Sequence, residues 1–525
     1  MFTRDAANAA YRLALCLIVA AGAAFSSLVI AQRYWLDDSF ITFRYFRNLF
    51  EGLGVVYNAG DAVEGYSNFL WGVVAWLGMH LGAEPIHFTQ WVSLAAQAAI
   101  LLVAYRIGVA ATGHPGRALL APALLAGQVA FLAYPMTGME STFFCLLVTL
   151  AFHLLNSEAH HRRGGAVALG LTFVALGMTR FDGMVLVGIL GSYWIFVRRD
   201  LRGLVLPLGI FAVGFLAHNA WRLGYYPTML PNSYHAKISF SLLSMVQGLG
   251  YVANFVVGGE QLTFALALIA LVLFRKSATR SFLCWVVVLQ VAYVVVVGGD
   301  WMPHHRFLYH VMPLLFLLVQ EGAWEAWDGL RPMVARPLLG GTALLVALVA
   351  LEAGPLYAAR RFNRLSARQF DTHDARMIGE ALDRILPEGT LIAIEWGGII
   401  PFYTHREVLD TFGLTDREIA SGSFERTIWG RAVYPEYIKS RGADLVAPCA
   451  RVFPTPQEAQ AAFRLPNGAC HYRYYPGMDS EDMGYELVPI QVGENAWWPA
   501  LVRRGKRILA AEPPVKVSDA VSPSA

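Results

Sequence analysis

Apolar residues occur in long runs through the first two thirds of the chain, and shorter polar segments separate these runs. Between about residues 12 and 357, many runs reach the roughly 20 residues that a helix needs to cross a hydrocarbon core. The pattern therefore predicts an all-α polytopic membrane protein. The first run, Tyr11 to Ala31, is too long for a signal-peptide core, and no small-residue cleavage site precedes Trp35. It is interpreted as a retained span.

The pattern changes after residue 357, where charged residues, Pro and other polar residues mix at frequencies typical of soluble domains. We expect a membrane part at residues 1–357, which includes a large first outer loop at 32–67. An extracytoplasmic α/β domain follows at 358–510. Residues 511–525 are rich in Pro, Ser and Val and are predicted to be disordered.

Period-two and helical patterns predict individual elements within this domain. The predicted strands are Thr390 to Ile394, Val408 to Leu409, and Asp444 to Ala447, and the predicted helices are Asp374 to Ile385 and Tyr434 to Ser440.

Basic residues concentrate in one set of loops, which the positive-inside rule makes cytoplasmic. These loops are Arg106 to Arg117, His160 to Arg163, Arg198 to Arg202, Arg275 to Arg280, and Arg331 to Arg336. The remaining loops hold nearly all the unusual polar residues and are predicted to be extracytoplasmic. The preferred topology has about 11 crossings, an inner N-terminus and an outer tail. It treats the short stretch from Asn68 to Leu81 as interfacial or re-entrant, and a 12-span alternative counts that stretch as a crossing.

Composition agrees with this class and narrows it. The 525 residues are 56% hydrophobic and 15% charged, with a mean hydropathy of +0.45. The net charge of +3 and the absence of a Lys/Arg-rich tract argue against nucleic acid as a partner. Cys16, Cys145 and Cys284 fall in apolar spans and are expected to be inert. A disulfide between Cys449 and Cys470 is expected if the tail faces an oxidising compartment.

The first outer loop begins with adjacent carboxylates, Asp37 and Asp38, directly after the first span. An Asp held near the bilayer surface can take the proton of an acceptor hydroxyl. Successive helical residues diverge by about 100°, so one Asp can face the substrate while the other orients loops or a metal such as Mg²⁺ or Mn²⁺. Arg44 and Arg47 share a helical face suited to a lipid phosphate. The alternative interpretation is a helix cap beside arginines that anchor the protein to headgroups.

Further candidates follow in the outer loops. Residues expected to contact a sugar or the acceptor are Glu64, Tyr66, Asn68, Glu140, Asp182, Asn232, Tyr234 and Asp300. Residues expected to contact a phosphate are Lys237, His304 and Arg306. The adjacent His304 and His305 form a weak metal signal, because no further His or Cys pair stands at ligand spacing.

Taken together, the outer-loop motifs resemble those of lipid-carrier glycosyltransferases of the GT-C class, and of the mycobacterial terminal β-(1→2) arabinofuranosyltransferase family in particular. The similar motifs are Asp37-Asp38-Ser39-Phe40-Ile41 with Arg44 and Arg47, Glu64-Gly65-Tyr66-Ser67-Asn68, Gly138-Met139-Glu140, Arg180 with Asp182-Gly183, Leu230-Pro231-Asn232-Ser233-Tyr234 with Lys237, Gly298-Gly299-Asp300-Trp301-Met302, and Ile400-Pro401-Phe402-Tyr403 with Asp410. The resemblance spans most of residues 33 to 420 and is specific only in aggregate.

The resemblance implies an enzyme of the cytoplasmic (inner) membrane that uses polyprenyl-phospho-arabinofuranose, with a first-loop carboxylate as the catalytic group. Departures from the family are Ser39-Phe40, Phe181, and the turn Glu395-Trp396-Gly397-Gly398, which replaces a smaller Asp-containing turn. We expect the change of this turn, which lies in the tail, to affect recognition of the acceptor. That acceptor could be a cell-wall arabinan, another envelope polysaccharide, or a glycoprotein such as a pilin.

The sequence leaves three other functions open. A second enzyme hypothesis keeps the GT-C fold with mannose, glucose or aminoarabinose as the transferred sugar. A transporter predicts polar residues at mid-membrane and repeat symmetry between halves, and neither feature stands out. A structural assembly subunit is the last alternative. No nucleotide cofactor is expected, because the inner loops lack a glycine-rich phosphate-binding motif.

Overall fold

The chain folds into two compact units in the computed structural model. Their ranges are Met1–Tyr34, Asn68–Gly224 and Ile238–Asn363 for the first, and Trp35–Ser67, Tyr225–Lys237 and Arg364–Ala525 for the second. We call these the helical unit and the α/β unit. The described residues are 4–31, 35–232, 242–257, 277–300, 302, 304–333, 372–420, 426–427, 430–431, 435–464, 470, 478–479 and 481–506. The first outer loop, expected within the membrane part, thus groups with the α/β unit, and the expected disordered tail lies outside the described residues.

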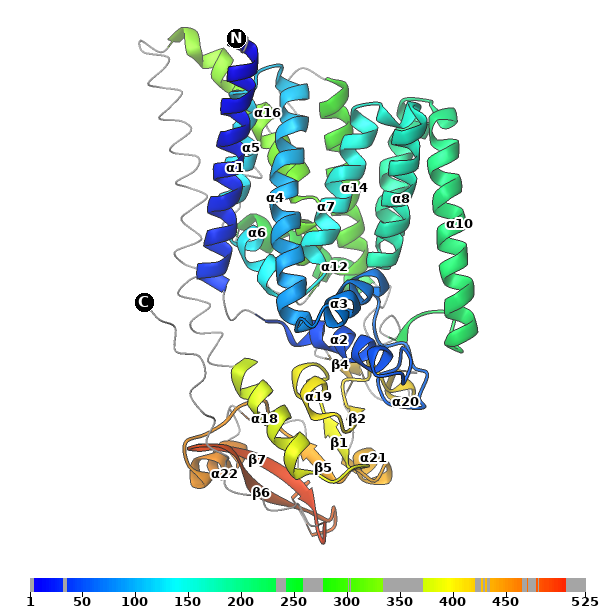
Figure 1. Ribbon diagram of the computed structural model, residues 1–525, viewed down its shortest axis with the longest axis vertical. Coiled ribbons are helices and arrows are strands. Elements are labelled where there is room, and N and C mark those ends of the chain that lie inside the picture. The colour runs from blue at the N-terminus through cyan, green and yellow to red at the C-terminus, as the bar shows by residue number, and fades with distance from the viewer. Residues whose placement is uncertain are drawn as a thin grey trace. The chain divides into compact units, whose positions relative to one another are not determined.

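The helical unit consists of helices packed around one apolar core (Figure 1). The helices before the α7–α8 turn are α1 (Arg4–Ala31), α3 (Phe69–His80), α4 (Pro85–Thr112), η1 (Arg117–Leu119), α5 (Leu120–Gly127), α6 (Val129–Ala133), η2 (Tyr134–Met136) and α7 (Ser141–Asn156). Those after it are η3 (Ala159–His161), α8 (Arg163–Thr179), α9 (Gly183–Ser192), η4 (Tyr193–Val197), α10 (Leu201–Tyr225), α12 (Leu242–Val257), α14 (Ala278–Val297), α15 (Arg306–Tyr309), α16 (Met312–Leu330) and η5 (Arg331–Met333).

Three helices among the described residues are long and apolar enough to cross a membrane, namely α4, α10 and α14. Arg117–Gly127 and Val129–Met136 form a fourth candidate that is bent by 69°. The α3 helix has 12 residues and is about 18 Å long, too short for a straight crossing. This length fits the interfacial or re-entrant interpretation of the stretch from Asn68 to Leu81. The expected total of about 11 or 12 crossings stays a prediction.

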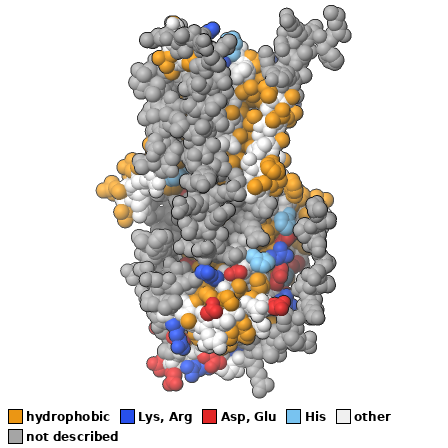
Figure 2. All heavy atoms as spheres, turned by 90° about the vertical axis from the view of Figure 1, so that its left-hand side faces the viewer, with side chains coloured by type: hydrophobic (Ala, Val, Ile, Leu, Met, Phe, Trp, Pro, Cys, Tyr) orange, Lys and Arg blue, Asp and Glu red, His pale blue; other side chains and the backbone are white. Residues whose placement is uncertain are grey.

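The surface of the helical unit is apolar where lipid would contact it. Leu201, Val205, Val213 and Leu216 of α10 are all exposed. On the face drawn in Figure 2, hydrophobic side chains dominate the described surface of the helical unit, whereas acidic and basic side chains gather on the α/β unit. Exposed apolar helix faces of this extent are stable in a hydrocarbon environment and costly in water.

The α/β unit contains a five-stranded sheet with the order β2-β1-β5-β7-β6. Its strands are β1 (Leu391–Ile394), β2 (Glu407–Asp410), β5 (Leu445–Ala447), β6 (Tyr485–Gly493) and β7 (Ala496–Arg503), and a separate two-stranded sheet comprises β3 (Arg426–Thr427) and β4 (Gly430–Arg431). Its helices are α2 (Asp37–Phe50), α18 (Thr372–Ile385), α19 (Ile399–Thr404), α20 (Arg417–Ala420), α21 (Pro435–Ser440) and α22 (Pro456–Arg464). The three predicted strands correspond to β1, β2 and β5, and the two predicted helices correspond to α18 and α21.

The antiparallel hairpin of β6 and β7 was not predicted from the pattern. Each strand contains a proline, and Pro489 lies opposite Pro499 in the ladder. Proline within a run argues against a strand because it cannot donate to the ladder. The hairpin forms nevertheless, and β7 pairs with β5 on its other side.

The expected disulfide between Cys449 and Cys470 is present, which confirms that prediction. Replacing both cysteines by Ser is expected to lower the free energy of unfolding of the α/β unit by about 3 kcal/mol, because the bridge closes a loop between residues 21 apart. Denaturant unfolding of the full chain, followed with and without a thiol reductant, measures this loss. Reductant should destabilise the wild type and leave the double variant unchanged. Equal sensitivity of the two proteins would contradict the prediction.

Candidate functional site

The first outer loop is held in the α/β unit by an aromatic helix face. Phe40 and Phe43 of α2 are fully buried. Their ring centroids lie 5.5 Å and 6.5 Å from that of Phe402 in α19. The alternation of aromatic and polar residues along α2 places these rings on one side, so burial of the rings docks α2 against α19.

Arg44 and Arg47, expected to bind phosphate, direct their guanidinium groups at oxygen atoms of the same unit. Arg44 donates to the carbonyl oxygens of Tyr57 at 2.8 Å and Arg406 at 2.7 Å, and also to that of Pro401. Arg47 donates to the carbonyl oxygen of Phe402. Both arginines are buried. In this arrangement they position α2 and the loop that follows it.

Asp37 sits at the beginning of α19. Its carboxylate accepts from the backbone N–H of Gly398 at 2.9 Å and of Ile399 at 2.7 Å. A Cβ atom at position 398 would lie 1.8 Å from the carbonyl oxygen of Asp37, so only glycine allows this approach. Burial raises the pKa of Asp37 to about 7, the two N–H donors oppose that rise, and Asp38 and Asp410 add to it.

Two further carboxylates lie at the carboxyl edge of the parallel strands. Glu395 directly follows β1 and Asp410 ends β2, and these strands are paired neighbours. Asp410 accepts from the backbone N–H groups of Phe412 and Thr415, each at 2.9 Å. Burial raises the pKa of Asp410 to about 6 and that of Glu395 to about 7. The carboxyl edge of a parallel sheet is a common position for ligand sites.

Raised carboxyl pKa values make stability depend on pH with a definite sign. For Asp410 the ordinary value is 3.8 and the folded value about 6, so the folded state binds more protons than the unfolded state between these limits. Its contribution to stability therefore grows as pH falls from about 6 towards about 4. The thermal unfolding midpoint of the wild type minus that of Asp410→Asn should rise as pH falls through this window. A difference that is constant or shrinks towards acid pH would contradict the assignment.

The remaining candidates of the α/β unit lie among buried contacts of that unit. The Asn232 side-chain amide donates to the carbonyl oxygens of Gly413 at 2.9 Å and Leu414 at 3.0 Å. The Asn232 backbone N–H donates to the Glu64 carbonyl oxygen at 2.8 Å. Tyr66 accepts from the Tyr226 hydroxyl at 3.3 Å. Tyr234 and Lys237 lie outside the described residues.

A second set of candidates meets inside the helical unit. Glu140 precedes α7, Arg180 follows α8, and Asp182 precedes α9. Arg180 bonds to Glu140 at 2.5 Å and to Asp182 at 2.8 Å. Asn68 donates to the second Glu140 oxygen at 2.9 Å. Burial raises the pKa of the Glu140 carboxyl, but Arg180, Arg306 and Asn68 stabilise its anion and bring the pKa below its usual range.

Asp300 and Arg306 extend this cluster. The Arg306 Nε atom lies 2.6 Å from Asp300 Oδ2, and both side chains are nearly buried. Electrostatic interactions connect Arg180 with Asp300, and Arg306 with Glu140. We call Asn68, Glu140, Arg180, Asp182, Asp300 and Arg306 the charged cluster. It combines three carboxylates with two guanidinium groups. When all five groups are ionised, the cluster carries a net charge of about −1.

Two histidines flank Arg306 in sequence, and one of them, His304, does not match the expected phosphate-binding cation. Burial, together with His305, lowers the pKa of His304 to about 4. His304 is therefore uncharged at neutral pH. His310 is fully buried and interacts electrostatically with Arg180 and Arg306. Sequence reasoning missed His310, because no motif marks it and only its position beside two distant arginines does.

The structure thus brings Asn68, Glu140, Asp182, Asp300 and Arg306 together in one unit, and Asp37, Asp38, Glu64, Tyr66 and Asn232 in the other. Arg180 was quoted only as part of a motif, although it is the residue that links Glu140 to Asp182. Among the described residues, Asp37 and Asp38 belong to no group of three ligand side chains close enough to hold a metal ion.

Comparisons with known proteins agree with this architecture. A family model described as "Domain of unknown function (DUF8728)" matches residues 364–496, within the α/β unit. The chain is 29% identical over 266 residues to the terminal β-(1→2)-arabinofuranosyltransferase of Mycobacterium tuberculosis, covering 46% of this chain and 41% of that protein. It is 26% identical over 343 residues to the enzyme of the same name from Corynebacterium glutamicum, covering 55% and 47%. The chain therefore spans less than half the length of these relatives.

Solved structures extend the comparison to the fold. ArnT from Cupriavidus metallidurans, solved bound to undecaprenyl phosphate, matches with a TM-score of 0.52 and 14% identity, covering 78% of this chain and 88% of that one. Its apo structure matches with a TM-score of 0.54 and 15% identity over the same shares. The predicted GT-C resemblance is thereby confirmed: this chain is similar in sequence to terminal β-(1→2)-arabinofuranosyltransferases and in fold to ArnT.

Proposed function

We propose that this protein is a membrane glycosyltransferase that moves arabinofuranose from a polyprenyl-phosphate donor to an acceptor outside the cytoplasmic membrane. Three findings support the proposal: the names of the two relatives, the fold similarity to a protein solved with undecaprenyl phosphate, and the outer-loop carboxylates. The observation that carries it is the pair Asp37 and Asp38 at the beginning of α2, where one carboxylate is fixed by two backbone N–H groups.

The two aspartates take different roles in this proposal. Asp37 is a positioning residue, because its carboxylate already holds the beginning of α19. Asp38 follows it on α2, rotated by about 100°, and acts as the general base. Its carboxylate takes the proton of the acceptor hydroxyl as that oxygen attacks C1 of the arabinose. The bond from C1 to the phosphate oxygen breaks, and polyprenyl phosphate leaves with the bonding electron pair.

The charged cluster is assigned to the donor. Arg306 contacts the phosphate, and Asp300 holds its guanidinium plane at 2.6 Å. Arg180 orients Glu140 and Asp182, whose free lone pairs accept hydrogen bonds from sugar hydroxyls together with Asn68. Within the α/β unit, Glu64, Tyr66 and Asn232 are assigned to the acceptor, and the substituted turn at Glu395 sets the acceptor preference.

A donor panel tests the sugar assignment. Full-length protein in membranes is given polyprenyl phosphates that carry arabinofuranose, aminoarabinose, mannose or glucose, with envelope extract as acceptor, and transfer is followed by mass spectrometry. We expect transfer from the arabinofuranose donor only. The fold similarity to ArnT makes a different polyprenyl-linked sugar the second candidate. Transfer of such a sugar, without arabinofuranose transfer, would retain the fold and overturn the donor.

A further inference from the structure

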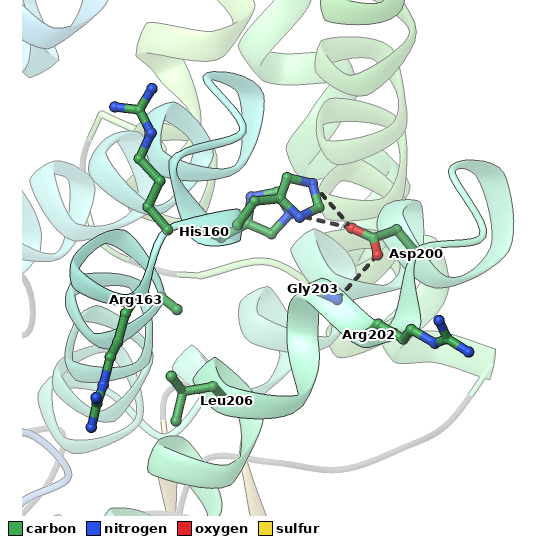
Figure 3. A pocket seen from close by; sticks show the side chains of 9 residues that line it. His160, Arg163, Asp200, Arg202, Gly203 and Leu206 are labelled. Atoms are coloured by element: carbon green, nitrogen blue, oxygen red, sulfur yellow. Dashed lines mark hydrogen bonds and ion pairs between the residues drawn. The ribbon is translucent and has the colours of Figure 1, made fainter.

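A cluster of histidine and aspartate side chains lies at the end of the helical unit where the α7–α8 turn meets α10. His160 and His161 belong to η3, and Asp200 directly precedes α10 (Figure 3). The charged cluster lies at the other end of α7 and α8, because Glu140 precedes α7 and Arg180 follows α8. The 16 residues of α7 separate the two ends by about 24 Å. The His–Asp group is therefore distinct from the proposed donor site.

Two of the three distances between the ligand atoms of this group match those around a bound metal ion. Asp200 Oδ2 lies 3.5 Å from His160 Nε2 and 3.4 Å from His161 Nε2. Tetrahedral Zn²⁺ holds nitrogen and oxygen ligands at roughly 2.1 Å, which puts neighbouring ligand atoms about 3.4 Å apart. All three ligand atoms lie within 4.8 Å of one another. A hollow of about 390 Å³ opens beside them and can admit a water ligand.

The imidazole of His160 is buried, so its nitrogen atoms need partners within the protein or a bound ligand. The side chain of His160 has 0% exposure, and its ring packs against that of Trp194 with centroids 4.4 Å apart. Among the described residues, neither nitrogen of His160 nor Oδ2 of Asp200 forms a hydrogen bond of good geometry, although Oδ2 lies within ion-pair distance of both imidazoles. Buried polar atoms are nearly always satisfied in native structures, so His160 Nε2 and Asp200 Oδ2, which face each other at 3.5 Å without a hydrogen bond of good geometry, favour a ligand beside them.

The surrounding backbone leaves room for that ligand. The other oxygen of Asp200 accepts from the Gly203 N–H at 3.0 Å, which fixes the carboxylate at the beginning of α10. A Cβ atom at position 203 would lie 2.5 Å from Asp200 Oδ2 and 3.0 Å from a carbon of each imidazole. Glycine therefore keeps the space beside the three ligands open. Figure 3 shows the guanidinium groups of Arg163 and Arg202 pointing away from the imidazole–carboxylate group.

We propose that His160, His161 and Asp200 bind one divalent transition-metal ion, best matched by Zn²⁺, which joins the α7–α8 turn to the beginning of α10. Two imidazoles and one carboxylate are a donor set that such ions favour. By the predicted topology this site is cytoplasmic. It does not depend on the proposed sugar transfer.

Metal binding by the full-length protein tests this inference. The protein is purified in detergent through an affinity tag that contains no histidine, stripped with EDTA, and dialysed against Zn²⁺ before elemental analysis. We expect one Zn²⁺ per chain and a rise in the thermal unfolding midpoint that EDTA reverses. Co²⁺ should give the visible absorption of a tetrahedral site.

Matched variants separate the site from adventitious binding. His160→Gln and Asp200→Asn should weaken Zn²⁺ binding, and Gly203→Ala, which keeps all three ligands, should weaken it by roughly 10- to 100-fold. His114→Gln changes an exposed histidine on another loop expected to be cytoplasmic and should leave binding unchanged. Unchanged size-exclusion profiles in EDTA show that each variant is folded. Equal Zn²⁺ binding by all variants, no binding by the folded wild type, or stabilisation by inorganic phosphate instead of Zn²⁺ would overturn the proposal.

Discussion

Replacing Asp38 by Asn is expected to lower the rate of sugar transfer by about 10²- to 10⁴-fold, the usual contribution of a positioned general base. The amide is nearly isosteric with the carboxylate but cannot accept the proton of the acceptor hydroxyl. Donor binding should change little, because Asp38 acts on the acceptor in this account. The measurement is the initial rate of labelled sugar transfer in membranes that contain equal amounts of each protein.

Asp61→Asn is the matched control, because Asp61 belongs to the same loop and is exposed. It should retain wild-type transfer. Asp37→Asn is expected to lose stability as well as activity. One of the two side-chain oxygens that accept from backbone N–H groups at the beginning of α19 is replaced by an NH₂ group, which is a donor and cannot accept. An Asp38→Asn protein that keeps more than about a tenth of the wild-type rate would exclude Asp38 as the base.

Replacing Arg180 by Leu is expected to destabilise the helical unit by about 3–5 kcal/mol. The substitution leaves Glu140, whose side chain is 2% exposed, and Asp182, at 8%, without their guanidinium partner. Unpaired buried carboxylates cost far more than the lost attraction alone. The thermal unfolding midpoint of the detergent-solubilised full chain, with intrinsic tryptophan fluorescence as the signal, measures this effect.

Two comparisons define the result for Arg180. Arg180→Lys keeps the charge but loses the fork that bonds both carboxylates, so an intermediate loss is expected. Arg198→Gln removes an exposed pair with Glu158 at 2.7 Å and should cost less than about 1 kcal/mol. A midpoint for Arg180→Leu as high as that for Arg198→Gln would show that the charged cluster does not hold the helical unit together.

Features that depend on neighbours in sequence could be predicted from the sequence. Continuous apolar runs bounded by turn residues predict the strands at Leu391 and Glu407. The helical period of the apolar residues predicts α18. The Asp37 and Asp38 pair is visible because adjacent carboxylates at a membrane exit are costly. The Cys449–Cys470 bridge followed from two cysteines in a tail expected to face an oxidising compartment.

Features that depend on distant partners could not be predicted. Arg44 and Arg47 do share a helical face, but their partners stand some 355 residues further along the chain, at Pro401 and Phe402. The local sequence shows that an arginine is present, but it does not show which oxygen atom accepts its hydrogen bond. Glu395 and Asp410 meet only because β1 and β2 pair in parallel. His310 could not be predicted for the same reason: no local motif marks it, and the two arginines with which it interacts are distant in sequence or belong to no shared motif.

The most direct test of sugar transfer from a lipid phosphate is to measure both products in one reaction. Full-length protein receives polyprenyl-phospho-arabinofuranose labelled in the sugar, and mass spectrometry follows labelled acceptor and free polyprenyl phosphate. The account predicts that both products appear in equal amounts, require acceptor, and disappear together in Asp38→Asn. Free polyprenyl phosphate without labelled acceptor, or equal product from wild type and Asp38→Asn, would contradict it.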